Sequence, residues 1–222
     1  MAKNQFLIKY DDPNSLISAF GLGPIGGRIE EKLFDLLNIY DNNVFLYSFA
    51  EEKFQEIYDK VIESDFDLSL LIKASFYLNV CLRMINTLDD ILLKIIVYTH
   101  LHFNGKSESE LDDESNDYRY RNYYDKFIAK SNTGYPQRAT RSNRKTRKIR
   151  NDITHSGDTL LISNPIKEDD SYTVVSDKGL MDRNVELYTS IIFDMQDDID
   201  EINKVRQQIE TIILNDPRFI KK

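Results

Sequence analysis

The residues best suited to chemistry in this chain lie in one stretch, from Arg138 to Gly157. Seven of the thirteen residues from Arg138 to Arg150 are Lys or Arg and none is acidic, whereas the whole chain has a formal net charge of −8. The stretch closes on Arg150-Asn151-x-x-x-His155. Arginine binds phosphate oxygens, and histidine exchanges a proton near neutral pH. Together they suit metal-independent RNA cleavage, in which the imidazole deprotonates a ribose 2′-OH and the guanidinium stabilises the charge that builds on the phosphate.

A helix is the element expected to position these residues. At about 100° per residue, one polar face would carry Arg147, Arg150, Asn151, Thr154 and His155, while Ile149 and Ile153 would face a core. Gly157 is expected to end the helix. Arg150 and His155 would lie about 140° apart around the helix axis. We therefore expect them to form opposite walls of a cleft between two helices, which can come from two copies of the protein.

The motif Arg150-Asn151-x-x-x-His155 resembles the signature of HEPN domains, which are all-helical and carry an Arg, a polar residue and a His at this spacing. In that family the motif lies on a helix at a homodimer interface. Many members are metal-independent endoribonucleases of toxin, phage-defence and CRISPR systems. The resemblance covers about residues 140–157. It implies that Arg150 and His155 are catalytic and that Asn151 supports them.

The function predicted on this basis is a metal-independent endoribonuclease of a toxin or phage-defence system, with no metal or other cofactor. Cleavage would leave a 2′,3′-cyclic phosphate and a 5′-OH end. The predicted partners are RNA, a second copy of the chain with the motif at the interface, and an antitoxin or regulatory protein. RNA is expected to contact the basic and polar residues of the stretch, namely Arg141, Arg144, Lys145, Arg147, Lys148 and Thr154.

Two alternatives use the same basic helix, residues 138–150. In the first, a helical module holds nucleic acid without cutting it. In the second, the protein is an assembly subunit that associates through its C-terminal helix, and the basic helix docks on an acidic partner. RNA binding without cleavage would favour the first alternative, and loss of oligomerisation on charging Ile192 and Ile199, with no RNA affinity, would favour the second.

The composition is that of a soluble globular protein, because 41% of the residues are hydrophobic and 30% are charged. The length fits one large domain or two small ones, and we predict a single HEPN-like helical domain over residues 1–222. The lone Cys81 excludes an internal disulfide, fits a reducing compartment, and is interpreted as a core residue. The N-terminus has no secretory hydrophobic segment and no run of 18 apolar residues occurs, so we predict a cytoplasmic protein without a membrane segment.

The periodicity of apolar residues predicts an all-α bundle of about five helices. The segment from Gly21 to Gly27 matches a dinucleotide-binding glycine pattern, and 44–49 could be the following strand. No further strand–helix alternation supports that interpretation, so a turn before a helix over 28–40 is favoured. Further helices are expected over 51–64 and, as a long central helix, over 66–103. His100 and His102, two residues apart, point away from each other on a helix, which disfavours a metal pair.

The second half of the chain is predicted to hold an exposed acidic loop over about 104–116 and an irregular insert over about 158–181, with a small hairpin near 159–176. Between them, Tyr118–Tyr124 interleaves tyrosines with arginines, and we favour packing on the bundle over stacking on RNA bases. A long helix over 182–215 carries an apolar seam. Its acids, including Asp194, Asp197, Asp198 and Glu201, are interpreted as a solvated face.

Overall fold

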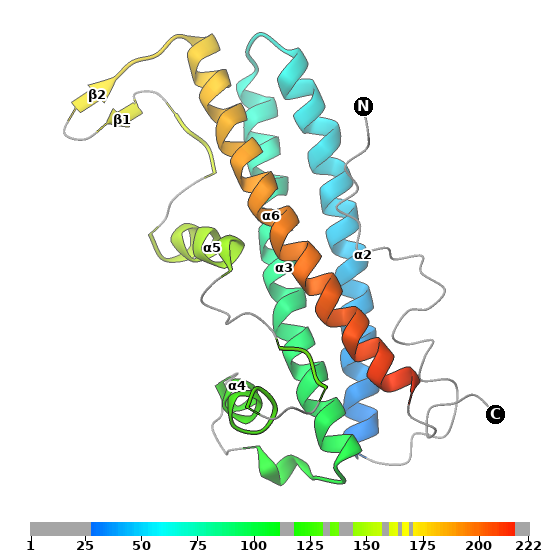
Figure 1. The fold of residues 1–222 in the computed structure, drawn as a ribbon. Coiled ribbons are helices and arrows are strands. Elements are labelled where there is room, and N and C mark those ends of the chain that lie inside the picture. The colour runs from blue at the N-terminus through cyan, green and yellow to red at the C-terminus, as the bar shows by residue number, and fades with distance from the viewer. Residues whose placement is uncertain are drawn as a thin grey trace. The chain divides into compact units, whose positions relative to one another are not determined.

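The computed structural model describes residues 28–111, 118–130, 134–137, 144–156, 160–163, 166–168 and 171–215. Its helices are α2 (Arg28–Glu63), α3 (Leu68–Phe103), α4 (Tyr118–Tyr123), α5 (Lys145–Ser156) and α6 (Asp177–Leu214), as Figure 1 shows. A 3-10 turn, η1, spans Glu108–Glu110, and a π-helical turn, η2 (Tyr124–Ile128), continues α4. The predicted all-α class, with a long central and a long C-terminal helix, is confirmed.

The predicted hairpin is also confirmed. Strand β1 (Ile166–Glu168) pairs antiparallel with β2 (Ser171–Thr173), with Glu168 opposite Ser171. The irregular insert is shorter than predicted, because α6 begins at Asp177 rather than at Asp182.

Helix α2 is one continuous helix, whereas the sequence had predicted two separate helices over 28–40 and 51–64. Residues 44–49 are helical, which excludes the strand of a dinucleotide-binding unit. The reason is that the three-to-four-residue spacing of buried residues continues without interruption from Leu37 through Val44 and Tyr47 to Phe54. The glycine run Gly21–Gly27 lies outside the described residues.

The chain divides into two compact units. Unit 1 comprises residues 1–6, 46–86 and 140–199, and unit 2 comprises residues 7–45, 87–139 and 200–222. Helices α2, α3 and α6 each contribute one part to unit 1 and the other part to unit 2. That residues 1–222 form a single domain stays a prediction.

The core of unit 1 is built around Tyr188 of α6. Its ring contacts those of Phe54 and Tyr58 from α2, and its hydroxyl donates to the carbonyl oxygen of Leu71 in α3 at 3.1 Å. Cys81 is fully buried in this unit, as predicted. Burial of these large rings binds the three helices together, because each aromatic side chain removes a large apolar area from water.

In unit 2 both histidines of α3 are held by protein side chains. The Nδ1 atom of His100 lies 3.0 Å from the Tyr123 hydroxyl, and that of His102 lies 3.2 Å from Glu30. Burial lowers the pKa of His100, and Lys106 lowers it further. Among the described residues no group of three or more His, Cys, Asp or Glu side chains could hold a metal ion.

The predicted acidic loop is partly ordered against this unit. Glu108 in η1 accepts a hydrogen bond from Tyr98 at 2.6 Å and pairs with Arg28 at 2.8 Å, and Leu111 is buried. The loop is therefore docked rather than fully exposed over the described residues 104–111.

Helix α3 is long and apolar enough to cross a membrane by length and composition alone, the only such helix among the described residues. Its most apolar 18-residue window has a mean hydropathy of 1.5, and a third of that window is buried. The core helix of a soluble protein, which is mostly buried, passes the same test of length and composition. The cytoplasmic location stays a prediction.

Helix α6 carries the predicted apolar seam, although individual residues of the seam differ from those expected. Ile191 and Val205 are buried, whereas Ile192, which the pattern placed in the seam, is half-buried. Val205 thus continues the buried seam between Ile202 and Ile209.

Candidate nucleic-acid interface

Helix α5 holds most of the predicted site residues. It begins at Lys145 and ends at Ser156, so the motif Arg150-Asn151-x-x-x-His155 lies in its second half. Arg141, predicted to contact RNA, lies outside the described residues, as does the rest of 138–143. The helix belongs wholly to unit 1, where it lies beside α3 and α6 (Figure 1).

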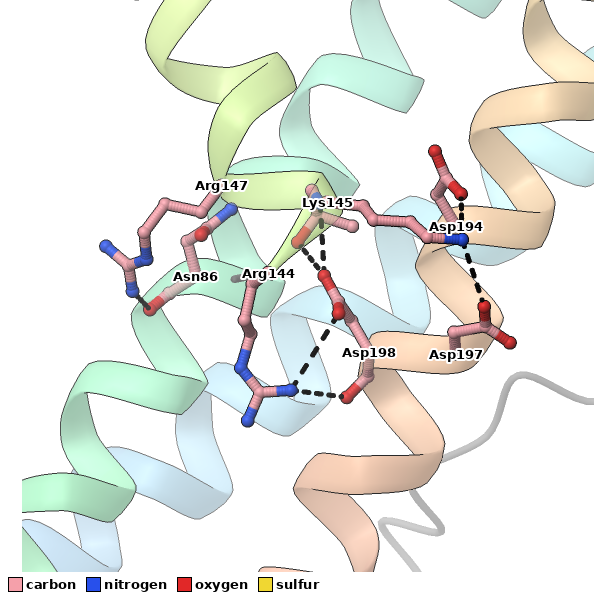
Figure 2. Close-up of polar contacts among 8 residues, drawn as sticks. Asn86, Arg144, Lys145, Arg147, Asp194, Asp197 and Asp198 are labelled. Atoms are coloured by element: carbon pink, nitrogen blue, oxygen red, sulfur yellow. Dashed lines mark hydrogen bonds and ion pairs between the residues drawn. The ribbon is translucent and has the colours of Figure 1, made fainter. Parts of the chain in front are cut away.

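The first turn of α5 is fixed to α6 by one carboxylate, that of Asp198. Asp198 Oδ2 accepts a hydrogen bond from the backbone N–H of Thr146 at 3.1 Å and another from the Thr146 hydroxyl. Arg144 Nη1 lies 3.8 Å from Asp198 Oδ1 and donates to the Asp198 carbonyl oxygen at 3.3 Å (Figure 2). The side chain of Asp198 is only 8% exposed, so these contacts replace water around it.

This contact explains how so basic a segment can start a helix. The first turn of α5 contains no acidic residue, and its positive side chains repel the positive end of the helix dipole. The first backbone N–H groups of a helix also lack partners within the helix. Asp198 of α6 supplies both an acceptor and a countercharge, since its carboxylate accepts the hydrogen bond of the Thr146 N–H and places a negative charge at the start of α5.

Lys145 is held by two further acids of α6. Its Nζ atom lies 2.9 Å from Asp194 Oδ1 and 3.3 Å from Asp197 Oδ2 (Figure 2). Hydrogen bonds to Asp194 and then Asp197 raise the pKa of Lys145. Its positive charge is therefore already shared with carboxylates of the same chain.

Arg147 does not lie on a solvent-facing polar surface, as the helical projection had predicted. It is 5% exposed, and its Nη2 atom donates to the carbonyl oxygen of Asn86 in α3 at 3.4 Å (Figure 2). Arg144 is 2% exposed. The two guanidiniums predicted to contact RNA are thus directed into unit 1, and the start of α5 serves as an anchor.

The interpretation of the α6 acids as a solvated face was wrong for Asp198. The sequence pattern placed this carboxylate away from the apolar seam of α6, which is correct, but that side of α6 is where α5 docks. The second alternative expected the basic helix to dock on an acidic partner; in the structure it docks on acids of its own chain.

Residues 148–155 of α5 include the remaining predicted residues. Arg150 and Asn151 are half-buried, whereas Lys148, Thr154 and His155 are exposed. The Thr154 hydroxyl donates to the carbonyl oxygen of Arg150 at 2.9 Å, which keeps this side chain against its own helix. Ile149 and Ile153, expected in a core, are only half-buried.

The arrangement can therefore offer the His155 imidazole to solvent, five residues beyond the Arg150 guanidinium on a helix whose start is fixed to α6. Sequence reasoning missed Asp198 and Asn86 as the residues that position this helix. For Asp198, the one signal in the sequence was that it lies in a cluster of acids with Asp194 and Asp197, which a basic segment of the chain could bind. For Asn86, whose carbonyl oxygen makes the contact, the sequence carries no signal, since every residue has one.

Comparison with family models, with curated proteins and with solved structures gives no match for this chain. The resemblance to HEPN domains accordingly stays a prediction that rests on the motif residues.

Proposed function

We propose that this protein is a metal-independent endoribonuclease of HEPN-like type, and that the second half of α5 carries its active site. The observation behind the proposal is that Lys148, Thr154 and His155 are accessible on α5 while the start of the same helix is fixed to α6. An accessible imidazole and a nearby guanidinium on a rigid element are the groups that cleavage at a ribose 2′-OH requires.

In the proposed reaction the neutral His155 imidazole takes the proton of a ribose 2′-OH. The 2′-oxygen then attacks the adjacent phosphorus, and the bond from phosphorus to the 5′-oxygen breaks. The leaving 5′-oxygen receives a proton, so the products are a 2′,3′-cyclic phosphate and a 5′-OH end. Arg150 stabilises the negative charge of the phosphorane, and Asn151 orients groups in the site.

The proton for the leaving oxygen would come from His155 of a second copy, because the described part of unit 1 supplies only one histidine. A homodimer with α5 at its interface is therefore part of the proposal. Lys148 and Thr154 remain as contacts to the RNA backbone, whereas the burial of Arg144 and Arg147 and the pairing of Lys145 argue against such a role for these three residues.

The test is cleavage of total RNA in the presence of EDTA by the wild type, His155→Ala, Arg150→Ala and the control Arg83→Ala. Arg83 is an exposed arginine of unit 1 on α3. We expect the first two substitutions to lower the rate by roughly 100-fold or more, as loss of a general base or of transition-state charge stabilisation does. Arg83→Ala should cut like the wild type, and the products should carry a cyclic phosphate.

Cleavage that survives His155→Ala would overturn the proposal. RNA binding without cleavage by any of these proteins, together with no toxicity on expression in cells, would favour the non-catalytic binding module instead. The toxin or phage-defence role, the restraining partner and the cytoplasmic location are proposed from the family resemblance, and co-purification from the native host would identify such a partner.

A further inference from the structure

A second basic surface lies in unit 2, on α4, η2 and the residues that follow them. From Tyr118 to Lys130 the chain has four cations and one acid, although its overall net charge is −8. Two of the cations, Lys126 and Lys130, are exposed. We name this segment, with Lys94 and Lys106 beside it, the aromatic–cationic surface.

The segment is held rigidly by its buried residues. The Tyr123 hydroxyl contacts His100 Nδ1 at 3.0 Å, and the Tyr124 hydroxyl donates to the carbonyl oxygen of Pro136 at 2.8 Å. Tyr120 and Ile128 are also buried, which confirms packing on the bundle for the tyrosines after Tyr118. The one-turn π-helix η2 follows α4 and contains Lys126, which is exposed, and Phe127, which is half-buried. Such turns are frequent at functional sites.

The cations of this surface lie over aromatic rings. Lys106 and Lys126 lie 4.4 and 4.9 Å from the centroid of the Phe127 ring. Arg119 and Lys94 lie 4.7 and 5.4 Å from that of Tyr120. A ring attracts a cation without neutralising its charge, so the contacts with Phe127 leave Lys106 and Lys126 positively charged. Glu108 lies near Arg119, and the ion pairs Arg121–Asp125 and Lys106–Glu110 are both at 3.6 Å. The two ion pairs are long and lie on solvent-accessible side chains, so each contributes little.

One aromatic ring of the surface is left open to solvent. Tyr118, at the start of α4, is 62% exposed. Tyr118 begins the segment whose later residues Lys126 and Lys130 are exposed. Proteins bind single-stranded nucleic acid by combining exposed aromatic rings with cations, because bases stack on the rings while the cations contact phosphates. A duplex or an acidic peptide could use the charges but has no free base to stack.

We propose that the aromatic–cationic surface of unit 2 binds single-stranded RNA, with Tyr118 stacking on a base and Lys126 and Lys130 contacting phosphates. The proposal rests on the proposed function only for the choice of RNA as the ligand. It assigns a binding site in unit 2, whereas α5 belongs to unit 1, and gives that site no part in the bond-breaking step.

The experiment measures the binding of a fluorescent oligoadenylate to the full chain carrying His155→Ala, so that RNA is not cut. Lys126→Gln with Lys130→Gln should reduce the salt dependence, the slope of log K against log salt, by about 1.4, since each single-strand phosphate contact contributes about 0.7. The matched control is Lys32→Gln with Lys204→Gln, two exposed lysines of unit 2 on α2 and α6, which should leave the slope unchanged.

Stacking is tested separately at Tyr118. Tyr118→Ala should weaken oligoadenylate binding roughly 5- to 100-fold, the usual effect of removing a stacked ring, whereas Tyr118→Phe should retain affinity. Equal slopes for the two lysine pairs would overturn the proposal. So would an unchanged affinity in Tyr118→Ala, which would instead assign the surface to a duplex or an acidic protein. Because binding is measured without cleavage, a failure here leaves the ribonuclease proposal untouched, and the reverse also holds.

Discussion

Glu51 is a carboxylic acid within the interior of unit 1, beside Tyr47 and Cys81. Burial raises the pKa of Glu51 to about 8, and the neighbouring Tyr47 hydroxyl opposes this only in part. Burial likewise raises the pKa of the Cys81 thiol, so Cys81 is unsuited to act as a nucleophile. At this position a proton, rather than a counter-ion, compensates for the lost hydration of the carboxylate.

The pKa of Glu51 predicts a pH-dependent stability. Because the pKa is higher in the folded chain than in the unfolded chain, the stabilisation is complete below about pH 4.5 and is lost as the pH rises through about 8. Glu51→Gln should remove this slope and raise the free energy of unfolding at pH 8 by on the order of 2 kcal/mol. Urea denaturation at several pH values measures both effects.

The control is Glu52→Gln, the next residue of α2, whose side chain is exposed. It should keep the pH slope of the wild type. If Glu51→Gln and Glu52→Gln gave the same pH profile, the carboxyl group of Glu51 would not be the titrating group.

At the scale of elements, the start of α5 depends on α6. Asp198 caps Thr146 and faces Arg144, whereas the neighbouring Asp197 has a side chain that is 69% exposed and pairs with Lys145, itself 59% exposed. The two adjacent carboxylates thus differ in burial, and a buried hydrogen-bonded charge contributes far more than an exposed ion pair.

Asp198→Asn should therefore lower the free energy of unfolding by about 2 kcal/mol or more, since it removes the carboxylate that faces the buried Arg144 guanidinium and caps Thr146. Hydrogen exchange should also show that the backbone amide of Thr146 loses protection, because its acceptor is weakened. Asp197→Asn is the matched control and should change stability by less than about 0.5 kcal/mol. Equal effects of the two substitutions would contradict this anchoring role of Asp198.

On the scale of the whole molecule, three helices run from one compact unit into the other without interruption. Helix formation is cooperative along a continuous hydrogen-bonded backbone. We therefore expect the two units to unfold in one transition. The fully buried Leu78 in α3 belongs to unit 1 and Leu37 in α2 to unit 2.

Leu78→Ala and Leu37→Ala should each lower the midpoint of the same urea transition, with a loss of about 2–5 kcal/mol from the cavity and the lost burial. Far-ultraviolet circular dichroism and hydrogen exchange should report coincident transitions. Two separate transitions, each shifted by only one of the two substitutions, would show that the units unfold independently.

The helices themselves were predictable from the sequence because their signal is local. A three-to-four-residue apolar period identified α3 within two residues of its start and α6 within five. The composition of the segment from 138 to 157 likewise indicated a basic helix with a motif in its second half. The division of α2 into helices over 28–40 and 51–64 was wrong, because the buried residues before, within and after 44–49 keep one three-to-four-residue spacing.

Only the tertiary structure decided which polar residues are buried. A helical projection treats every charged residue as solvated, yet Arg144, Arg147 and Asp198 lie inside unit 1. Their burial depends on partners 54 and 61 residues away, in helices whose approach the sequence does not encode in any local pattern. The sequence thus determined where the helix that carries Arg150 and His155 lies in the chain. The tertiary structure decided which of its cations anchor it and which remain for a ligand, because a buried charge is stable only where folding brings a countercharge or an acceptor to it.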